Sequence, residues 1–120
     1  MNPMKSDDAA WAAGVISVMG RFENGKVFRV KKHGQEVYAR LVFSSRNHRE
    51  VADRLAGLMG VQVKEKLQKE ATVYSVQVIE DELHEFMKAI WDNLPRARRQ
   101  EYAKIRAASR ASVVEDSTGA

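Results

Sequence analysis

The sequence contains no cysteine and only two prolines among its 120 residues. The lack of cysteine excludes disulfides, cysteine-based zinc sites, iron–sulfur clusters and thiol nucleophiles, and it favours a reducing compartment, so we expect a cytoplasmic protein. No stretch approaches the roughly 18 consecutive apolar residues that a membrane-spanning helix needs. Residues 1–10 also lack the apolar segment of a secretory signal. We therefore expect neither a membrane partner nor a secretory leader.

Length and composition are those of one globular unit. A chain of 120 residues is too short for separate cofactor and substrate domains, and 44% hydrophobic with 30% charged residues is too apolar for a disordered chain. We expect a single domain over residues 1–110 and a flexible polar tail over residues 111–120. Lysine and arginine number 20 against 16 acidic residues, which gives a net charge of +4. This balance favours a polyanionic partner such as a nucleic acid.

Periodicity and turn residues predict the element order α-β-β-α-β-β-α-α, which is an α+β fold with an antiparallel sheet. Asn24-Gly25 and His33-Gly34 are typical of turns, and Gly60 is typical of a helix end. Asn47, three residues before Glu50, resembles the start of a capping box for the middle helix. The expected helices cover residues 6–19, 48–59, 80–92 and 96–110, and the expected strands cover residues 21–23, 26–32, 36–44, 61–69 and 72–79.

Alternation along the strands divides the expected sheet into two faces. The apolar set should face the helices: Phe28, Val30, Val37, Ala39, Leu41, Phe43, Val61, Val63, Leu67, Tyr74, Val76 and Val78. The opposite set is basic and amide-rich, and we interpret it as a candidate DNA-binding surface: Arg29, Lys31, Tyr38, Arg40, Gln62, Lys64, Lys66, Ser75 and Gln77. Cations of this kind neutralise phosphates, and arginine and glutamine read base edges. The alternative is the ordinary solvated face of an antiparallel sheet.

The first helix carries an unusual set of small residues. At 100° per residue, Ala10, Ala13, Gly14 and Ser17 share one side of this helix. Small side chains allow two helix backbones to approach closely, so we predict that this side is a dimer interface.

The segment Trp11-Ala12-Ala13-Gly14-Val15-Ile16-Ser17-Val18-Met19-Gly20-Arg21-Phe22, followed by two strand pairs with a helix between them, resembles the LAGLIDADG family of homing endonucleases. The resemblance covers residues 8–106 and is to the single-motif members, which pair as homodimers. It implies an αββαββα fold with an optional extra helix, an antiparallel sheet saddle and helices on one face of the sheet. It also implies that the motif helices meet at a two-fold axis and that double-stranded DNA lies in the saddle.

The sequence departs from this family at the catalytic positions. Active members end the motif with two acidic residues, the second of which holds a divalent metal at the scissile phosphate, and here these positions match Ser17 and Met19. A thioether is a soft, weak ligand, whereas Mg²⁺ requires hard oxygen ligands. We therefore expect no catalytic residue, no metal and no cofactor at this site. Glu23 is the only nearby acid that offers an alternative metal ligand.

These observations predict a catalytically inactive homodimer that binds double-stranded DNA, either as a regulator or as a retained remnant of an endonuclease from a phage or another mobile element. One alternative is an active endonuclease that uses Mg²⁺ and Glu23. Another is a protein-binding or RNA-binding module on the same fold. The basic residues of the last helix fit two roles, phosphate clamps or a solvated helix face: Arg96, Arg98, Arg99, Lys104, Arg106 and Arg110.

Overall fold

The computed structural model describes residues 4–29 and 34–118, with backbone alone at residues 27–29, 34–36 and 111–118. The strands form one antiparallel four-stranded sheet in the order β1-β2-β4-β3. The elements in chain order are α1 Ser6–Met19, β1 Gly20–Arg29, β2 Gly34–Arg46, α2 Arg49–Met59, β3 Lys64–Gln68, β4 Ala71–Ile79, α3 Glu80–Ile90, the short 3₁₀ helix η2 Trp91–Asn93, and α4 Arg96–Thr118. The predicted α+β class and element order are confirmed.

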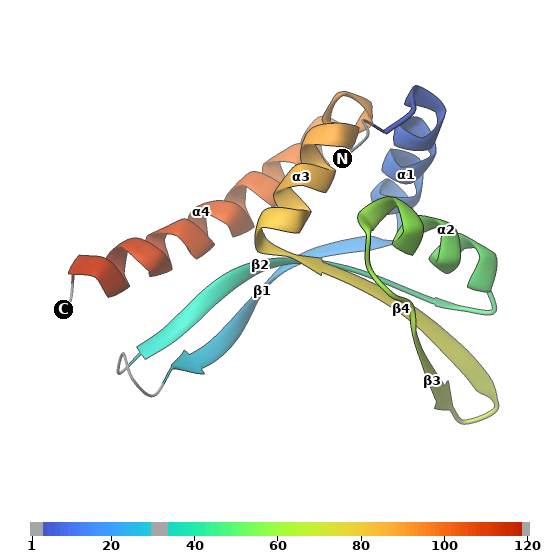
Figure 1. Ribbon diagram of the computed structural model, residues 1–120, viewed down its shortest axis with the longest axis horizontal. Coiled ribbons are helices and arrows are strands. Elements are labelled where there is room, and N and C mark those ends of the chain that lie inside the picture. The colour runs from blue at the N-terminus through green and yellow to red at the C-terminus, as the bar shows by residue number, and fades with distance from the viewer. Residues whose placement is uncertain (1–3, 30–33, 119–120) are drawn as a thin grey trace.

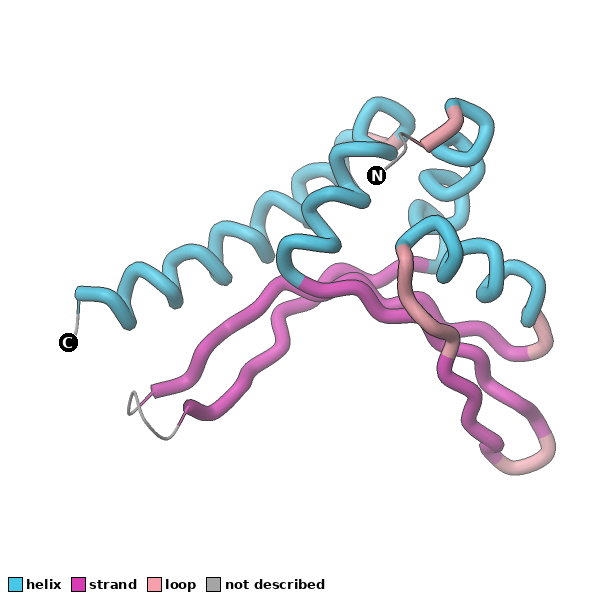
Figure 2. The backbone as a smooth tube through the Cα atoms, viewed as in Figure 1, coloured by secondary structure: helices cyan, strands magenta, loops and turns pink. Residues whose placement is uncertain are grey.

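The helices lie on one side of the sheet, and the other side is left uncovered (Figure 2). The β1–β2 hairpin and the β3–β4 hairpin diverge beneath the helix layer, so the sheet forms an arch that opens away from the helices (Figure 1). In the same view α4 follows the β1–β2 hairpin, whereas α2 lies over the other half of the sheet. The predicted saddle with helices on one face is therefore confirmed.

The core lies between the sheet and the helices. Strand register places Leu41 opposite Val78 and Phe43 opposite Val76, and all four side chains are almost completely buried. Apolar positions with helical spacing on α1 and α3, such as Ile16 and Leu83, close the core from the other side. Alternation therefore predicts the buried face of the central strands. At the edge it is wrong, because Leu67 on the short strand β3 lies beyond the helix layer and is 74% exposed.

Asn24-Gly25 lies inside β1, and the predicted turn there is wrong. The side chain of Asn24 donates a hydrogen bond of 2.8 Å to the backbone carbonyl of Ile105, which ties the strand to α4. Gly25 pairs with Tyr38 across the sheet, and a Cβ atom at Gly25 would come within 2.2 Å of the tyrosine ring. Asparagine therefore binds α4, and glycine leaves room for the tyrosine ring of the neighbouring strand. Both residue types are also typical of turns, which is why the sequence pattern is misleading here.

The helix ends agree with the sequence in part. Gly60 ends α2 in the left-handed conformation at φ 72°, as predicted. The capping box is wrong, because α2 follows His48 and makes no side-chain cap hydrogen bond. α4 continues to Thr118, past the expected end at Arg110, and the flexibility of residues 111–120 stays a prediction. None of the helices in the described part of the chain combines the length and hydrophobicity of a membrane-spanning segment.

Candidate nucleic-acid interface

The uncovered face of the sheet is built from side chains that strand register places in rows. One row is Ser44, Ser75 and Lys64, and the next is Arg46, Val73 and Lys66. Two further rows are Arg21, Val42 and Gln77, and Glu23, Arg40 and Ile79. Directly paired residues of antiparallel strands point to the same side, so these rows form one surface. We call this surface the outer face.

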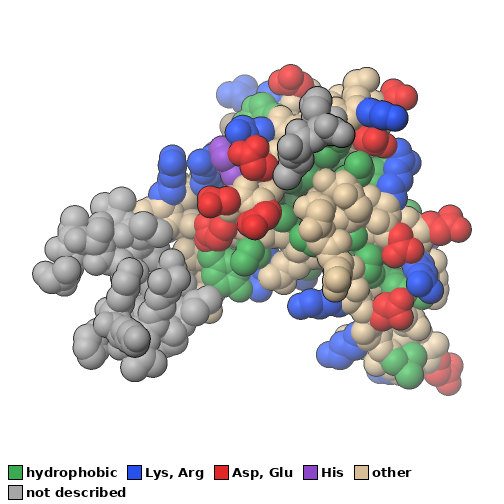
Figure 3. Space-filling model, in the orientation of Figure 1, with side chains coloured by type: hydrophobic (Ala, Val, Ile, Leu, Met, Phe, Trp, Pro, Cys, Tyr) green, Lys and Arg blue, Asp and Glu red, His purple; other side chains and the backbone are tan. Residues whose placement is uncertain are grey.

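The outer face is mainly cationic. Its lysines and the arginines Arg21 and Arg46 are exposed, and no ion pair between described residues neutralises any of them. Figure 3 shows lysine and arginine side chains along the inner margin of the arch under the β3–β4 hairpin, with acidic side chains on its outer margin. A concave, cationic surface of this kind attracts a polyanion along its length.

The outer face brings together most of the residues predicted from the sequence. Six of them share it: Tyr38, Arg40, Lys64, Lys66, Ser75 and Gln77. Gln62 is exposed but precedes β3 in a loop. Arg29 pairs with Gly34 at the far end of β1, and Lys31 lies outside the described residues. Their roles in binding stay predictions.

Sequence reasoning missed two cations of the outer face. Arg21 lies at the start of β1 beside Val42, and Arg46 lies at the end of β2 beside Val73. Arg21 lies two residues before Glu23 and Arg46 lies six residues after Arg40, so period-2 alternation places both on the same face as these residues. Arg21 was missed because a turn was expected at Asn24-Gly25, and Arg46 was missed because the strand was expected to end at Ser44.

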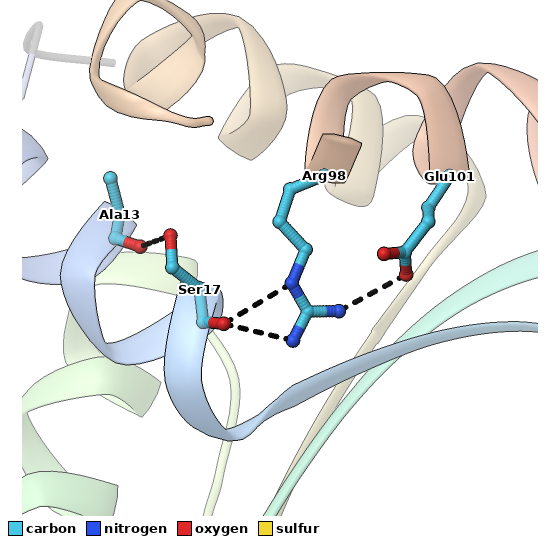
Figure 4. Close-up of polar contacts among 4 residues, drawn as sticks. All are labelled: Ala13, Ser17, Arg98 and Glu101. Carbon is cyan, nitrogen blue, oxygen red and sulfur yellow. Dashed lines mark hydrogen bonds and ion pairs between the residues drawn. The ribbon is translucent and has the colours of Figure 1, made fainter. Parts of the chain in front are cut away.

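Arg98 of α4 holds the carboxyl end of α1 (Figure 4). Its Nη2 and Nε donate hydrogen bonds of 3.0 and 3.3 Å to the backbone carbonyl of Ser17, while its Nη1 pairs with Glu101 at 3.1 Å. The last carbonyls of a helix lack partners inside the helix and carry partial negative charge, so a guanidinium stabilises them. Arg98 therefore stabilises the carboxyl end of α1, the end that carries Ser17 and Met19.

The residues at this end of α1 do not fit a divalent metal. The Ser17 hydroxyl donates to the carbonyl of Ala13 at 2.6 Å, and Met19 offers only a thioether. The carboxylate of Glu23 pairs with Arg40 at 2.6 Å. In the part of the chain that the structure describes, no group of three or more histidine and acidic side chains lies close enough to hold a metal ion. The chemistry of this donor set therefore opposes the metal-dependent alternative.

The small-residue side of α1 is divided between the surface and the core, and its role as a dimer interface stays a prediction. Ala10 and Gly14 are exposed, and a Cβ atom added at Gly14 would have nothing within 4 Å. The prediction for Ala13 is wrong, because its side chain is completely buried in the core of the same chain, as is that of Ile16. Val18 continues the exposed side and is 82% exposed. Ala10, Gly14 and Val18 follow one another at intervals of four residues and form a ridge, which we call the α1 ridge; Ser17 is half-buried at its margin.

Three of the basic residues of α4 have partners within the chain. Arg98 bonds to Ser17 as described, and Arg99 donates a hydrogen bond of 2.9 Å to the carbonyl of Trp91. Arg106 contacts the imidazole of His84, and burial together with this guanidinium lowers the pKa of His84 below its ordinary value. These three cations stabilise the helix layer, which lies on the opposite side of the sheet from the outer face.

The α3–α4 boundary also contains a cavity of about 310 Å³, lined on the helix side of the sheet by acidic and basic residues together. Tyr102 lies in its wall, and burial raises the pKa of this tyrosine. Glu80 closes one end: its carboxylate accepts hydrogen bonds of 3.2 Å from the backbone N–H of Ala39 and from the Ser109 hydroxyl. The mixed charge of the lining gives this cavity no preference for a phosphate, so the outer face remains the candidate interface.

Removal of the Arg98 guanidinium should loosen the end of α1 selectively. In Arg98→Met we expect faster amide hydrogen exchange over residues 16–20 and a loss of about 1.5 kcal/mol of unfolding free energy, because a charge-assisted hydrogen bond to a backbone carbonyl is lost. Arg99→Met is the matched control, since Arg99 caps the carbonyl of Trp91 in the same way. Equal exchange at residues 16–20 in the two variants would show that Arg98 does not hold α1.

Comparison with known proteins bears on the fold. No protein-family model matches the sequence, and no curated protein matches it. Solved structures do match. The homing endonuclease I-TnaI superposes with a TM-score of 0.65 at 16% identity, over 88% of this chain and 71% of that one. At such identity the likeness shows the fold, and not the activity.

Two further matches are homing endonucleases solved with DNA. I-CvuI, in complex with the I-CreI target and Mg with the DNA not cleaved, gives a TM-score of 0.65 at 15% identity over 85% of this chain and 68% of that one. The group I intron-encoded I-CeuI, complexed with DNA, gives 0.67 at 10% identity over 96% of this chain and 59% of that one. The fold implied by the sequence resemblance is thereby confirmed.

Proposed function

We propose that this chain, which has the fold of the homing endonucleases, binds double-stranded DNA as a homodimer and does not cleave it. The observation that carries the proposal is the outer face: an arched sheet surface, free of helices, with exposed cations on β1, β2 and β3. Solved proteins of the same fold, I-CeuI and I-CvuI, are complexed with DNA. Phosphate neutralisation by these cations would supply most of the affinity, and it would decrease with salt.

A second copy of the chain would complete the interface. The α1 ridge exposes Ala10, Gly14 and Val18, and the valine is 82% exposed, so a second helix packed on the ridge would remove apolar surface from water. Pairing of two ridges about a two-fold axis would bury this valine and place the two arched sheets side by side. A symmetric dimer of this kind would read two half-sites related by an inverted repeat.

The absence of cleavage follows from the chemistry at the end of α1. Hydrolysis of a phosphodiester by this fold requires a carboxylate that positions a divalent metal, and Ser17 and Met19 supply none. Glu23, the acid of the alternative nuclease hypothesis, is paired with Arg40. A protein that occupies a DNA site without cutting it acts as a regulator or persists as a remnant of an endonuclease.

Binding and cleavage assays on the purified full chain test the proposal. We expect duplex DNA of random sequence to be bound at low salt, with an affinity that decreases linearly on a log–log plot against salt concentration, and bound more tightly than hairpin RNA. A supercoiled plasmid should stay intact with Mg²⁺ or Mn²⁺. Nicking that disappears in Glu23→Gln would instead establish the endonuclease alternative. Binding of RNA alone, or of neither nucleic acid, would favour the RNA-binding or protein-binding module.

A further inference from the structure

The centre of the outer face holds an acid and an arginine in direct contact. Glu23 on β1 pairs with Arg40 on β2, and Arg40 pairs in turn with Ile79 on β4, so the three side chains form one row across the sheet. The Arg40 Nη2 lies 2.6 Å from the Glu23 carboxylate. Glu23 is the only acid in the four rows named above, and register places one further acid, Glu36, on the same side of β2 towards the far end of the hairpin. An acid at this place opposes the attraction of a polyanion, so it requires an explanation other than phosphate binding.

The guanidinium of Arg40 is fixed on several sides. Besides its contact with Glu23, its Nη1 donates a hydrogen bond of 3.4 Å to the Tyr38 hydroxyl, and its central carbon lies 5.8 Å from the centre of that ring. Its Nε is buried and has no hydrogen-bond partner among the described residues. The side chain as a whole is only 27% exposed. Arg40 therefore presents the Nη side of a rigid, planar fork at the surface, whereas no ion pair between described residues holds the other cations of the outer face.

Rigid and mobile cations suit different parts of DNA. A mobile lysine follows a phosphate wherever it lies, and it gains affinity without regard to sequence. A planar arginine fork held in one orientation matches the two acceptors O6 and N7 of guanine in the major groove. An acid beside the arginine keeps the fork oriented and repels a phosphate that approaches the same place. Binding is therefore weaker wherever the protein is aligned on the DNA so that no base edge meets the fork.

We propose that Glu23 is a positioning residue that makes Arg40 a reader of guanine rather than a phosphate contact, so that this pair determines sequence specificity at the centre of the outer face. The inference rests on the proposed DNA-binding function and deepens it. Arg40 contacts the base edge, and Glu23 acts through Arg40. The apolar side chain of Ile79, 38% exposed at the end of the same row, faces the neighbouring base pair.

Selection from a random duplex library, followed by affinity measurement on random-sequence duplex, tests this pair. Wild-type protein should enrich sites with at least one required guanine in each half-site, and Glu23→Gln and Arg40→Lys should both lose that requirement. Glu23→Gln should also bind random-sequence duplex about 5-fold more tightly at low salt, and its salt slope should steepen by about 0.9 per protomer, because Arg40 becomes free to neutralise a phosphate.

Asp8→Asn provides the matched control. Asp8 forms a similar ion pair with Arg54 at 3.0 Å, but on the helix side of the sheet, so the variant removes the same charge away from the outer face. It should leave both the selected sequence and the salt slope unchanged. Circular dichroism and thermal unfolding of each variant verify that the fold is retained.

Three results would overturn the inference, and they are distinguishable. If Glu23→Gln selects the same sites and binds random duplex as the wild type does, the pair is only a structural cross-strand contact and DNA binding by the outer face stands. If Glu23→Gln loses binding to all duplex DNA, the acid contributes to affinity itself. If wild-type protein binds no duplex DNA at low salt, the proposed function and the inference fail together.

Discussion

Gly14→Leu should leave the protein monomeric while each protomer becomes more stable. Gly14 lies in the middle of the α1 ridge, where an added Cβ atom meets nothing within 4 Å in the protomer. A leucine there costs no contact in the fold and gains about 0.8 kcal/mol of helix propensity over glycine. Between two α1 helices in close contact, however, it appears twice, and two overpacking penalties of about 1–3 kcal/mol each raise the dissociation constant about 100-fold.

Sedimentation equilibrium and thermal unfolding measure the two effects separately. The midpoint of unfolding of the wild-type protein should rise with protein concentration, because dimerisation stabilises the folded state, and that of Gly14→Leu should not. Gly57→Leu is the matched control, since Gly57 is also an exposed helical glycine with nothing within 4 Å of an added Cβ atom. It lies on α2, so it should stabilise the protomer equally and leave the dimer intact. A Gly14→Leu protein that dimerises as the wild type does would exclude the α1 ridge as the interface.

The ridge also illustrates what the sequence could predict and what it could not. Helical spacing places Ala10, Ala13, Gly14 and Ser17 on one side of α1, but this side spans about 100° at 100° per residue, and one edge of it is buried in the core. Ala13 is therefore buried while Gly14 is open. Periodicity gives the relative orientation of residues on a helix. Which side of α1 faces the core depends on the positions of the sheet and α3, and the sequence of α1 alone does not give these positions.

The strands, too, contain positions that the sequence predicts correctly and positions that it does not. Central positions such as Leu41 and Val78 are buried, and each follows a polar residue on the other face, Arg40 or Gln77, so period-2 alternation predicts them correctly. At Asn24-Gly25 the local signal is that of a turn, yet the carbonyl of Ile105, 81 positions away, binds the asparagine. A contact between residues so far apart leaves no pattern in a single sequence, and it outweighs the local preference.

At the end of α1 the sequence predicts the missing carboxylate but not the contact of Arg98 with the Ser17 carbonyl. The residue type of Met19 alone excludes a hard oxygen ligand, so the missing carboxylate is visible in the sequence. From the sequence alone, Arg98 is one of several basic residues of the last helix, for which two roles stay open. Its bond to the carbonyl of Ser17 joins residues 81 positions apart and involves a backbone atom that every residue possesses. Only the position of α4 in the fold, from which Arg98 reaches the end of α1, selects that carbonyl.

Reversal of the charges at Lys64 and Lys66 should remove most of the affinity for DNA. Both side chains are exposed on β3, which has no buried residue, so Lys64→Glu/Lys66→Glu should change the unfolding free energy by less than about 0.5 kcal/mol. Each lost phosphate contact lowers the steepness of the salt dependence by about 0.9, so two per protomer lower it by about 3.6 in a dimer. The new carboxylates also repel phosphates, and together these effects weaken binding about 100-fold or more at low salt.

The control must separate a local effect from a change in net charge. Lys88→Glu/Lys104→Glu alters the net charge by the same amount, with both exposed side chains in the helix layer on α3 and α4. If the outer face is the interface, this variant should lose only a few-fold in affinity through long-range repulsion, which salt screens over about 10 Å at 0.1 M, and its salt slope should stay near that of the wild type. Equal losses in the two variants would mean that DNA responds to the overall charge of the protein, and a larger loss in the control would move the interface to the helix layer.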